Sequence, residues 1–214
     1  MSKFQFHSNP SHTVGVELEL GIVDGDSFAL TGRSNELLAL LPSEVAESCK
    51  HELMQSCVEV ISCVCDDVAG ARKDLSGKIR SVQQVADQLG LGLWWGATHP
   101  FSRWDEQVVT EDERYQGLVR LLQEMARRLI TFGLHVHVGV DSGDKAVMIC
   151  DRIMQHLPLL LALSASSPYW EERDTGLHSY RSKVMEGLPT AGLPTLMRNW
   201  SEYVWLVNHM EETG

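Results

Sequence analysis

The sequence predicts a mixed α+β fold, because strand patterns and helix patterns follow one another along the whole chain. Residues 13–23 and 134–140 alternate apolar and polar side chains, which is the period of a half-buried strand. Residues 67–89 repeat apolar side chains every three or four positions, which is the period of an amphipathic helix. With 214 residues the chain can bury a substantial core, and we treat residues 1–214 as a single domain.

The first two elements are a strand and a short helix. Residues 13–23 read TVGVELELGIV, so Glu17 and Glu19 lie on the polar face of the predicted strand. Residues 34–41 form the short helix, and Ser34 is placed to cap its first turn.

The next segments continue this mixture. Residues 51–64 become rich in β-branched side chains toward their end, which indicates either one strand or a turn followed by a strand. The helix at 67–89 has the clearest pattern of the chain, and Gly90 follows it as a stop signal. Residues 90–98, GLGLWWGAT, are typical of a buried strand.

The second half begins with an amphipathic helix predicted over residues 113–132. The strand at 134–140, LHVHVGV, places two histidines on one polar face. Residues 142–164 form a long helical stretch that Pro158 should kink or split. Residues 166–194 are expected to be a long loop, and residues 195–210 a last helix.

Charge and composition exclude several classes of protein. Eighteen Lys and Arg against 29 Asp and Glu give a net charge of −11, which disfavours nucleic acids and anionic membranes as partners. The N-terminus shows no signal peptide, and the most apolar run, residues 157–163, is much shorter than the roughly 20 residues that span a bilayer. Five cysteines without a CxxC pair favour a reducing, cytoplasmic location.

Two pairs of polar residues carry the candidate chemistry. Glu17 and Glu19 lie about 6 to 7 Å apart on one side of their strand, where their like charges repel unless a cation lies between them. His135 and His137 have the same spacing. An isolated ExE strand is more often a solvated sheet face, and an isolated HxH pair is as often surface as ligand. Both pairs occur on strands that alternate apolar and polar side chains, and this joint occurrence favours a functional site.

Glu52 and Glu59 add two carboxylates beside the second predicted strand. Because carboxylates outnumber imidazoles, the set suits Mg²⁺ or Mn²⁺ better than zinc, and Mg²⁺ sites typically serve phosphate substrates. The sequence contains neither a GxxxxGK[ST] nor a GxGxxG motif, so P-loop and Rossmann chemistry are not supported. The residues by themselves therefore predict a carboxylate-rich metal site that handles a nucleotide.

Several motifs in order give the chain a family resemblance. They are TVGVELEL (13–20), HELMQSCVEV (51–60), GATHPF (96–101), DERYQ (112–116), FGLHVHVG (132–139) and LSASSPY (163–169), followed by Asp174-Thr175, Arg181 and residues 189–194. With them the chain resembles the type 2 glutamate-cysteine ligases, carboxylate-amine ligases whose fold is similar to that of glutamine synthetase. The resemblance implies a curved antiparallel or mixed sheet with helices packed on its outer face.

The resemblance also implies a reaction. ATP would phosphorylate a substrate carboxylate, and an amine would attack the acyl phosphate to give an amide, ADP and phosphate, with Mg²⁺ or Mn²⁺ as the cofactor. In the family the acid is glutamate, through its γ-carboxylate, and the amine is cysteine. By position, Glu19, Glu52 and Glu59 would form one metal site, and Glu17 and His135 would contribute to a second.

Two further roles follow from the resemblance. His137 would approach the ATP phosphates, and Arg181 would stabilise a substrate carboxylate or the transferring phosphate as a catalytic residue. On the residues alone, the less favoured alternative is that Glu52 is only an exposed residue before a strand and that Arg181 is a surface loop residue. Arg114 and His99 lie in matching motifs without an assigned role.

The family continues beyond the last residue of this sequence, with a Gly-Thr-x-Glu-x-Arg strand that supplies another metal-binding Glu and a phosphate-facing Arg. We therefore expect an incomplete sheet and weak or absent ligase activity of this chain alone, unless a partner completes it. Two alternatives stay open, a degenerate relative that only binds nucleotide or metal, and a metallohydrolase built on the HxH strand. The resemblance also favours a homo-oligomer that acts on small-molecule substrates.

Overall fold

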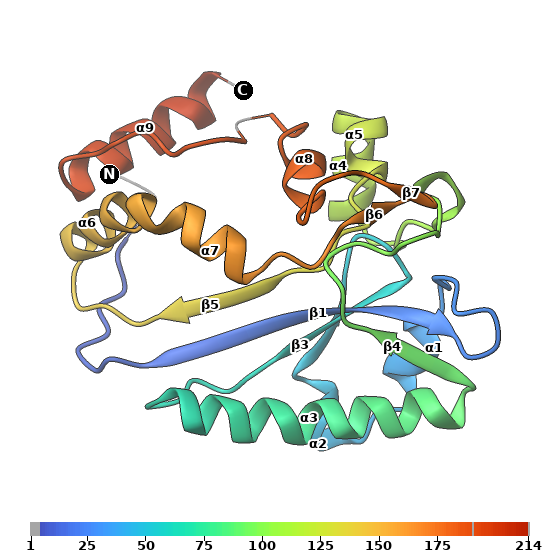
Figure 1. Ribbon diagram of the computed structural model, residues 1–214. Helices are drawn as coiled ribbons and strands as arrows, with labels where there is room; N and C mark the ends of the chain where they lie inside the picture. The colour runs from blue at the N-terminus through green and yellow to red at the C-terminus, as the bar shows by residue number, and fades with distance from the viewer. Residues whose placement is uncertain (1–4, 190, 214) are drawn as a thin grey trace.

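An antiparallel sheet forms the centre of the computed structural model, which describes residues 5–189 and 191–213. The ends of the predicted domain, residues 1–4 and 214, and residue 190 of the 189–194 motif lie outside the described residues. The strands of the sheet are β1 (Val14–Asp24), β2 (Cys49–His51), β3 (Cys57–Ile61), β4 (Leu91–Trp94) and β5 (Leu134–Val138). The order is β2-β3-β1-β4, and β5 pairs with the first half of β1 on the same side as β4 (Figure 1). The predicted α+β class is thus confirmed, and the five strands pair antiparallel throughout.

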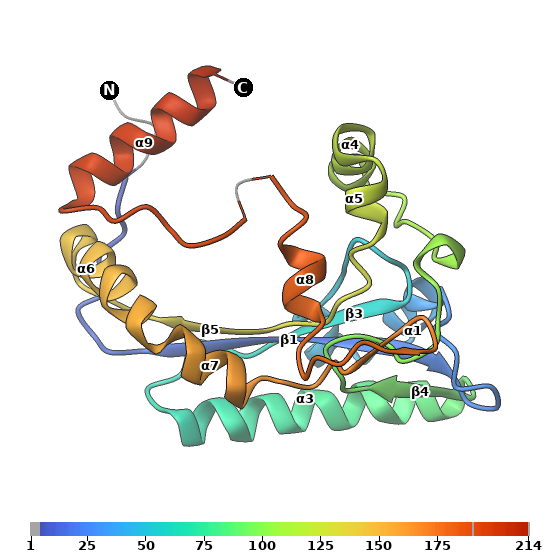
Figure 2. The same ribbon diagram turned by 45° about the horizontal axis from the view of Figure 1, so that its top comes forward.

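One face of the sheet is closed by the long helix α3 (Val68–Gln88), which runs beneath the strands in both views (Figures 1 and 2). Leu20 and Ile22 of β1 are fully buried there against Val82 and its neighbours, together with α1 (Ser34–Ala39) and α2 (Ser43–Ala46). The predicted helix boundaries agree with α3, since the Asp67 side chain accepts from Gly70 N–H at 2.7 Å and caps it.

On the opposite face of the sheet, the second core cluster is covered near the C-terminal end of β1. There α4 (Glu113–Leu122), α5 (Glu124–Arg127) and α8 (Arg181–Met185) cover the second core cluster, together with the hairpin of β6 (Tyr169–Trp170) and β7 (Arg173–Asp174). Trp170 is the largest side chain in this cluster and is 1% exposed. The alternation of β1 explains the arrangement, because Glu17 and Glu19 share their face with Val23, which enters this cluster.

The helical stretch after β5 divides as expected from its proline. It comprises α6 (Gly143–Ile153), the 3₁₀ turn η2 (Met154–His156) and α7 (Leu157–Leu163), and Pro158 occupies the first turn of α7. Taken together, residues Gly143–Leu163 are long and apolar enough by length and composition to cross a membrane, and 6% of the stretch is buried. Its length of 21 residues overturns the argument that the apolar run is too short, although one such helix is weak evidence for a span. The absence of a membrane partner stays a prediction.

The outer face of β5 is apolar and exposed. Leu134, Val136 and Val138 are 60 to 63% accessible there, in contrast to Leu20 and Ile22 on the apolar side of β1, which are fully buried. An apolar strand face of this kind is typical of a surface that another protein segment or subunit covers. The homo-oligomer nevertheless stays a prediction.

Two expectations about helices were wrong. Ser34 is the buried first residue of α1 and makes no cap; its Oγ lies 3.4 Å from His51 Nδ1. The helix expected over 113–132 breaks at Gln123, whose φ of 50° lies outside the helical region, so that α4 and α5 are separate.

The segments around these helices also differ from expectation. The long loop at 166–194 contains the β6-β7 hairpin and α8, and the last helix, α9, spans Trp200–Thr213. The turn-and-strand alternative for 51–64 is the correct one, because β2 ends at His51 and β3 begins at Cys57. A short 3₁₀ turn, η1 (Trp104–Glu106), precedes α4.

Candidate active site

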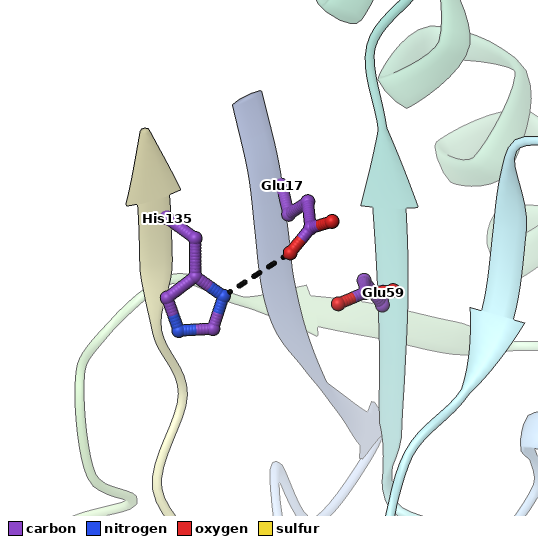
Figure 3. Close-up of side chains that lie close together, drawn as sticks. All are labelled: Glu17, Glu59 and His135. Atoms are coloured by element: carbon purple, nitrogen blue, oxygen red, sulfur yellow. Dashed lines mark ion pairs between the residues drawn. The ribbon is translucent and has the colours of Figure 1, made fainter. Parts of the chain in front are cut away.

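Strand register brings the predicted polar residues onto one face of the sheet. Glu17 pairs with His135 of β5, and Glu19 pairs with Glu59 of β3. Because directly paired residues in an antiparallel sheet point to the same side, the carboxylates and the imidazole converge over β1. Figure 3 shows Glu17, Glu59 and His135 directed toward one another from three neighbouring strands.

The first cluster comprises Glu17, Glu59 and His135, whose ligand atoms all lie within 4.8 Å of one another. Glu17 Oε2 lies 3.4 Å from His135 Nδ1 and 3.2 Å from His137 Nε2. Burial raises the pKa of Glu17, but hydrogen bonds and charges from His137 and His135 outweigh it and leave the pKa lowered. Glu17 is therefore ionised near neutral pH and available as a ligand.

The second cluster comprises Glu19, Glu52 and Glu59, again with ligand atoms within 4.8 Å. Glu52 follows β2 in the turn that leads to β3, and Glu59 is only 8% exposed. Burial and the neighbouring carboxylates raise the pKa of both Glu52 and Glu59. Three converging carboxylates, two of them costly to ionise, form an arrangement that a divalent cation would stabilise.

Glu59 belongs to both clusters, which the sequence did not predict. The resemblance places it in one site only, together with Glu19 and Glu52. In the structure its carboxylate lies within reach of that pair and of the Glu17–His135 pair, so the Glu59 side chain could serve as a ligand in either cluster.

Arg181 also reaches this region, from the first residue of α8. A Cβ atom at Gly133 would lie 3.2 Å from Arg181 Nη2, 3.2 Å from Glu19 Oε2 and 3.1 Å from His135 Nε2, so these atoms surround one point. Arg181 Nε is buried and, within the described part of the chain, has no hydrogen-bond partner. Arg181 is thus a cation beside the carboxylates and not a surface loop residue.

Gly133 is a site residue that sequence reasoning missed. Its N–H donates to Glu19 Oε2 at 2.7 Å, and its missing side chain leaves room for Arg181 and His135. The motif FGLHVHVG contains it, but a glycine before a strand is too common to signal this role. Lys50 was missed as well; it pairs with Glu59 in the β2-β3 register and so lies on the same face.

The donor set fits a hard divalent cation. Four carboxylates and one imidazole offer mostly oxygen ligands, the set that Mg²⁺ and Mn²⁺ prefer, and no cysteine belongs to either cluster. The seven residues predicted from the sequence therefore lie in one region of the structure. The Glu17 carboxylate contacts both His135 and His137. Their individual roles stay predictions.

The first testable consequence is a pH-dependent stabilisation by Mg²⁺. Since the folded pKa values of Glu52 and Glu59 are raised above 4.5, the folded chain binds these protons more tightly than the unfolded chain. As pH rises above 4.5, the two glutamates ionise and the folded chain loses stability. Mg²⁺ binds the ionised carboxylates and should therefore restore this stability. The Mg²⁺-induced rise in Tm should therefore be small near about pH 4.5 and grow toward about pH 7.

The difference between Tm with and without Mg²⁺ is the correct readout. Burial lowers the pKa of His99, so this residue stabilises the chain more as pH rises, opposite in sign to the two glutamates. That contribution is the same with and without metal and cancels in the difference. An equal Mg²⁺ effect at both ends of the range would contradict the assignment.

Gly133→Ala should weaken divalent-cation binding by about tenfold or more, because the added methyl displaces three site side chains by a few tenths of an ångström. Gly77→Ala is the matched control, since its Cβ on the surface of α3 would meet nothing within 4 Å. That control should bind metal normally and be more stable by about 0.5–1 kcal/mol. Titration with Mn²⁺ measures the metal affinity of both variants. An unchanged affinity of Gly133→Ala would refute the positioning role of Gly133.

Comparison with known proteins gives one consistent picture. A model of the glutamate-cysteine ligase family 2 (GCS2) matches residues 13–214. Curated relatives named "Putative glutamate--cysteine ligase 2-1" from Frankia casuarinae and "Putative glutamate--cysteine ligase 2" from Gloeobacter violaceus are 48% and 43% identical to this chain, over 91% and 98% of it. The matches cover 52% and 57% of those relatives, so the chain spans about half their length.

Solved structures show the same fold at low sequence identity. A bifunctional glutathione synthetase from Pasteurella multocida superimposes with a TM-score of 0.71 at 14% identity, over 94% of this chain and 30% of that one. A glutamate–cysteine ligase from Francisella tularensis, solved in complex with AMP, has a TM-score of 0.57 at 13% identity, over 77% of this chain and 37% of that one. These similarities establish the expected fold.

Proposed function

The chain belongs to glutamate-cysteine ligase family 2, and we propose that it carries the metal-binding portion of an ATP-dependent ligase that joins a carboxylate to an amine. In this reaction the γ-phosphoryl group of ATP passes to the acid, and the amine displaces phosphate from the acyl phosphate. An amide, ADP and phosphate leave. Glutamate is the proposed acid and cysteine, or a similar amine, the proposed second substrate.

The observation that carries the proposal is the pair of carboxylate clusters sharing Glu59, with Arg181 beside them. Phosphoryl transfer needs cations around the transferred group, because negative charge is spread over its oxygens. Two adjacent carboxylate-rich clusters would hold such cations, and the Arg181 guanidinium adds a positive charge of its own, on one face of the sheet. Bound Mg²⁺ or Mn²⁺ would supply charge neutralisation of the phosphate oxygens.

Different residues of the chain would hold the cations and contact the phosphate. Glu19, Glu52 and Glu59 would hold one cation, and Glu17, His135 and the shared Glu59 the other. His137 is exposed, and its Nε2 lies 3.2 Å from Glu17 Oε2. When the imidazole carries a proton on both ring nitrogens, its Nδ1 can donate to a phosphate oxygen.

Arg181 is the second catalytic candidate. Its planar fork can bind a carboxylate or a phosphate in a bidentate manner, and its position beside Glu19 and His135 puts it next to the proposed cations. Its buried Nε needs a hydrogen-bond acceptor, and a substrate oxygen is one that this site could receive.

Product analysis tests the proposal. The purified chain is incubated with Mg²⁺, ATP, glutamate and cysteine, and ADP and amide are measured with each component omitted in turn. We expect ADP release that requires all four, at a rate below that of the longer relatives, whose length this chain covers by about half. ATP binding without product would favour the degenerate relative, and amide hydrolysis without nucleotide would favour the metallohydrolase.

A further inference from the structure

Glu52 differs from the other glutamates of the two clusters because it does not lie in a strand. Glu17 and Glu19 are held in the ladder of β1 and Glu59 in that of β3, whereas Glu52 lies in the turn between β2 and β3. Its carboxylate nevertheless comes within 4.8 Å of those of Glu19 and Glu59, whose like charges repel it when no cation is bound. The position of Glu52 therefore depends on contacts outside the ladder of the sheet.

Three successive carbonyl groups of this turn accept hydrogen bonds from the start of α4 and the residues just before it. The Tyr115 hydroxyl donates to the His51 carbonyl at 3.1 Å. Thr110 donates twice, from its hydroxyl to the Glu52 carbonyl at 2.6 Å and from its N–H to the Leu53 carbonyl at 2.9 Å. The backbone is thus fixed at Glu52 and on both sides of it.

The two hydroxyl groups belong to buried side chains, since Thr110 is 5% and Tyr115 is 7% exposed. Arg114 Nη2 donates to Tyr115 Oη at 2.7 Å, and because a guanidinium is a donor only, the one hydroxyl proton of Tyr115 is left for the His51 carbonyl. Removing a buried donor leaves its carbonyl without a partner, which costs the desolvation of that group. The two hydroxyl groups therefore form a stiff support for the turn.

We propose that Thr110 and Tyr115 are positioning residues, whose hydroxyl groups hold the turn so that the Glu52 carboxylate meets those of Glu19 and Glu59 at one cation. Neither residue belongs to a carboxylate cluster, so both act through Glu52 and not as ligands. Supporting partners of metal ligands typically change the affinity by about 10- to 100-fold when they are removed. The inference rests on the proposed function, because it concerns the support of the cation site in that reaction.

Mn²⁺ titration of conservative variants, each shown by circular dichroism to be folded, tests the proposal. Thr110→Val keeps the shape of threonine and Tyr115→Phe keeps the ring, and each loses one hydroxyl, so each should weaken Mn²⁺ binding by about tenfold. Thr110→Ser retains the hydroxyl and should bind nearly as well as the unchanged chain. Thr175→Val is the matched control, because its hydroxyl donates to the Pro168 carbonyl at 2.7 Å beside the β6-β7 hairpin, and it should bind Mn²⁺ normally.

A double-mutant cycle separates positioning from a general loss of structure. In the Glu52→Gln background the Thr110 hydroxyl has no carboxylate to place, so Thr110→Val should weaken Mn²⁺ binding there by less than about twofold. A general disturbance of the fold would instead lower the Mn²⁺ affinity by the same factor in both backgrounds. Equal losses in the two backgrounds, or normal Mn²⁺ binding by both Thr110→Val and Tyr115→Phe, would overturn the inference.

Product analysis distinguishes this inference from the ligase proposal. If ADP and amide form and both hydroxyl variants bind Mn²⁺ normally, the positioning role fails and the ligase stands. If both variants lose Mn²⁺ affinity as described and the unchanged chain forms no nucleotide-dependent product, the ligase proposal fails and the positioning role stands.

Discussion

Glu59→Gln is expected to abolish Mg²⁺ binding to this chain, with a loss in affinity of at least about 100-fold, because it removes the one carboxylate that both clusters share. Loss of a direct ligand should exceed the effect of disturbing a supporting residue, which is about 10- to 100-fold. The variant should also lose the Mg²⁺-induced rise in Tm at every pH, and with it any nucleotide-dependent product.

The metal-free variant should be as stable as the unchanged chain or more stable. Burial and nearby carboxylates raise the pKa of Glu59, so its ionised form is unfavourable without a cation, and an amide of the same size removes that cost. Glu44→Gln, at an exposed position of α2, is the charge-matched control and should bind Mg²⁺ normally. A normal Mg²⁺ shift in Glu59→Gln would show that the clusters do not hold the metal.

Leu20→Ala should reduce the free energy of unfolding by about 2–5 kcal/mol. Leu20 of β1 is fully buried, pairs with Val58 of β3, and shares its core cluster with Ile22 and Val82, so its removal leaves a cavity that the sheet can fill only in part. Denaturant titration followed by circular dichroism measures the change.

Leu121→Ala is the matched control for this substitution. Leu121 is 78% exposed on α4, and its removal should change the free energy of unfolding by less than about 0.5 kcal/mol. Since Leu20 is the neighbour of Glu19 on β1, the core variant should also loosen the site on the opposite face. A loss below about 1 kcal/mol for Leu20→Ala would mean that this core cluster is not closely packed.

Local patterns predicted much of this structure. The alternation of β1 placed Glu17 and Glu19 on one side of the strand, and the same period placed His135 and His137 together. The helical period and the Gly90 stop signal predicted α3 almost to the residue. In each case the signal lies within one turn or a few residues, which a sequence displays directly.

Non-local features were the ones that the sequence missed. The break at Gln123 depends on how α4 and α5 pack over the second core cluster, and the pattern of 113–132 continues through it. The interior position of Ser34 depends on its neighbour His51, 17 residues away. The role of Gly133 depends on Arg181, which arrives from α8.

The sequence by itself therefore determined the family, the main strands and helices, and which residue types could form a cation site. Only the tertiary structure decided that Glu59 joins two clusters, that Arg181 lies beside them, and that two buried hydroxyl groups hold the turn at Glu52. The physical reason is strand register. Side-chain alternation is a property of one strand, whereas the pairing of Glu19 with Glu59 and of Glu17 with His135 is fixed only when separate strands meet.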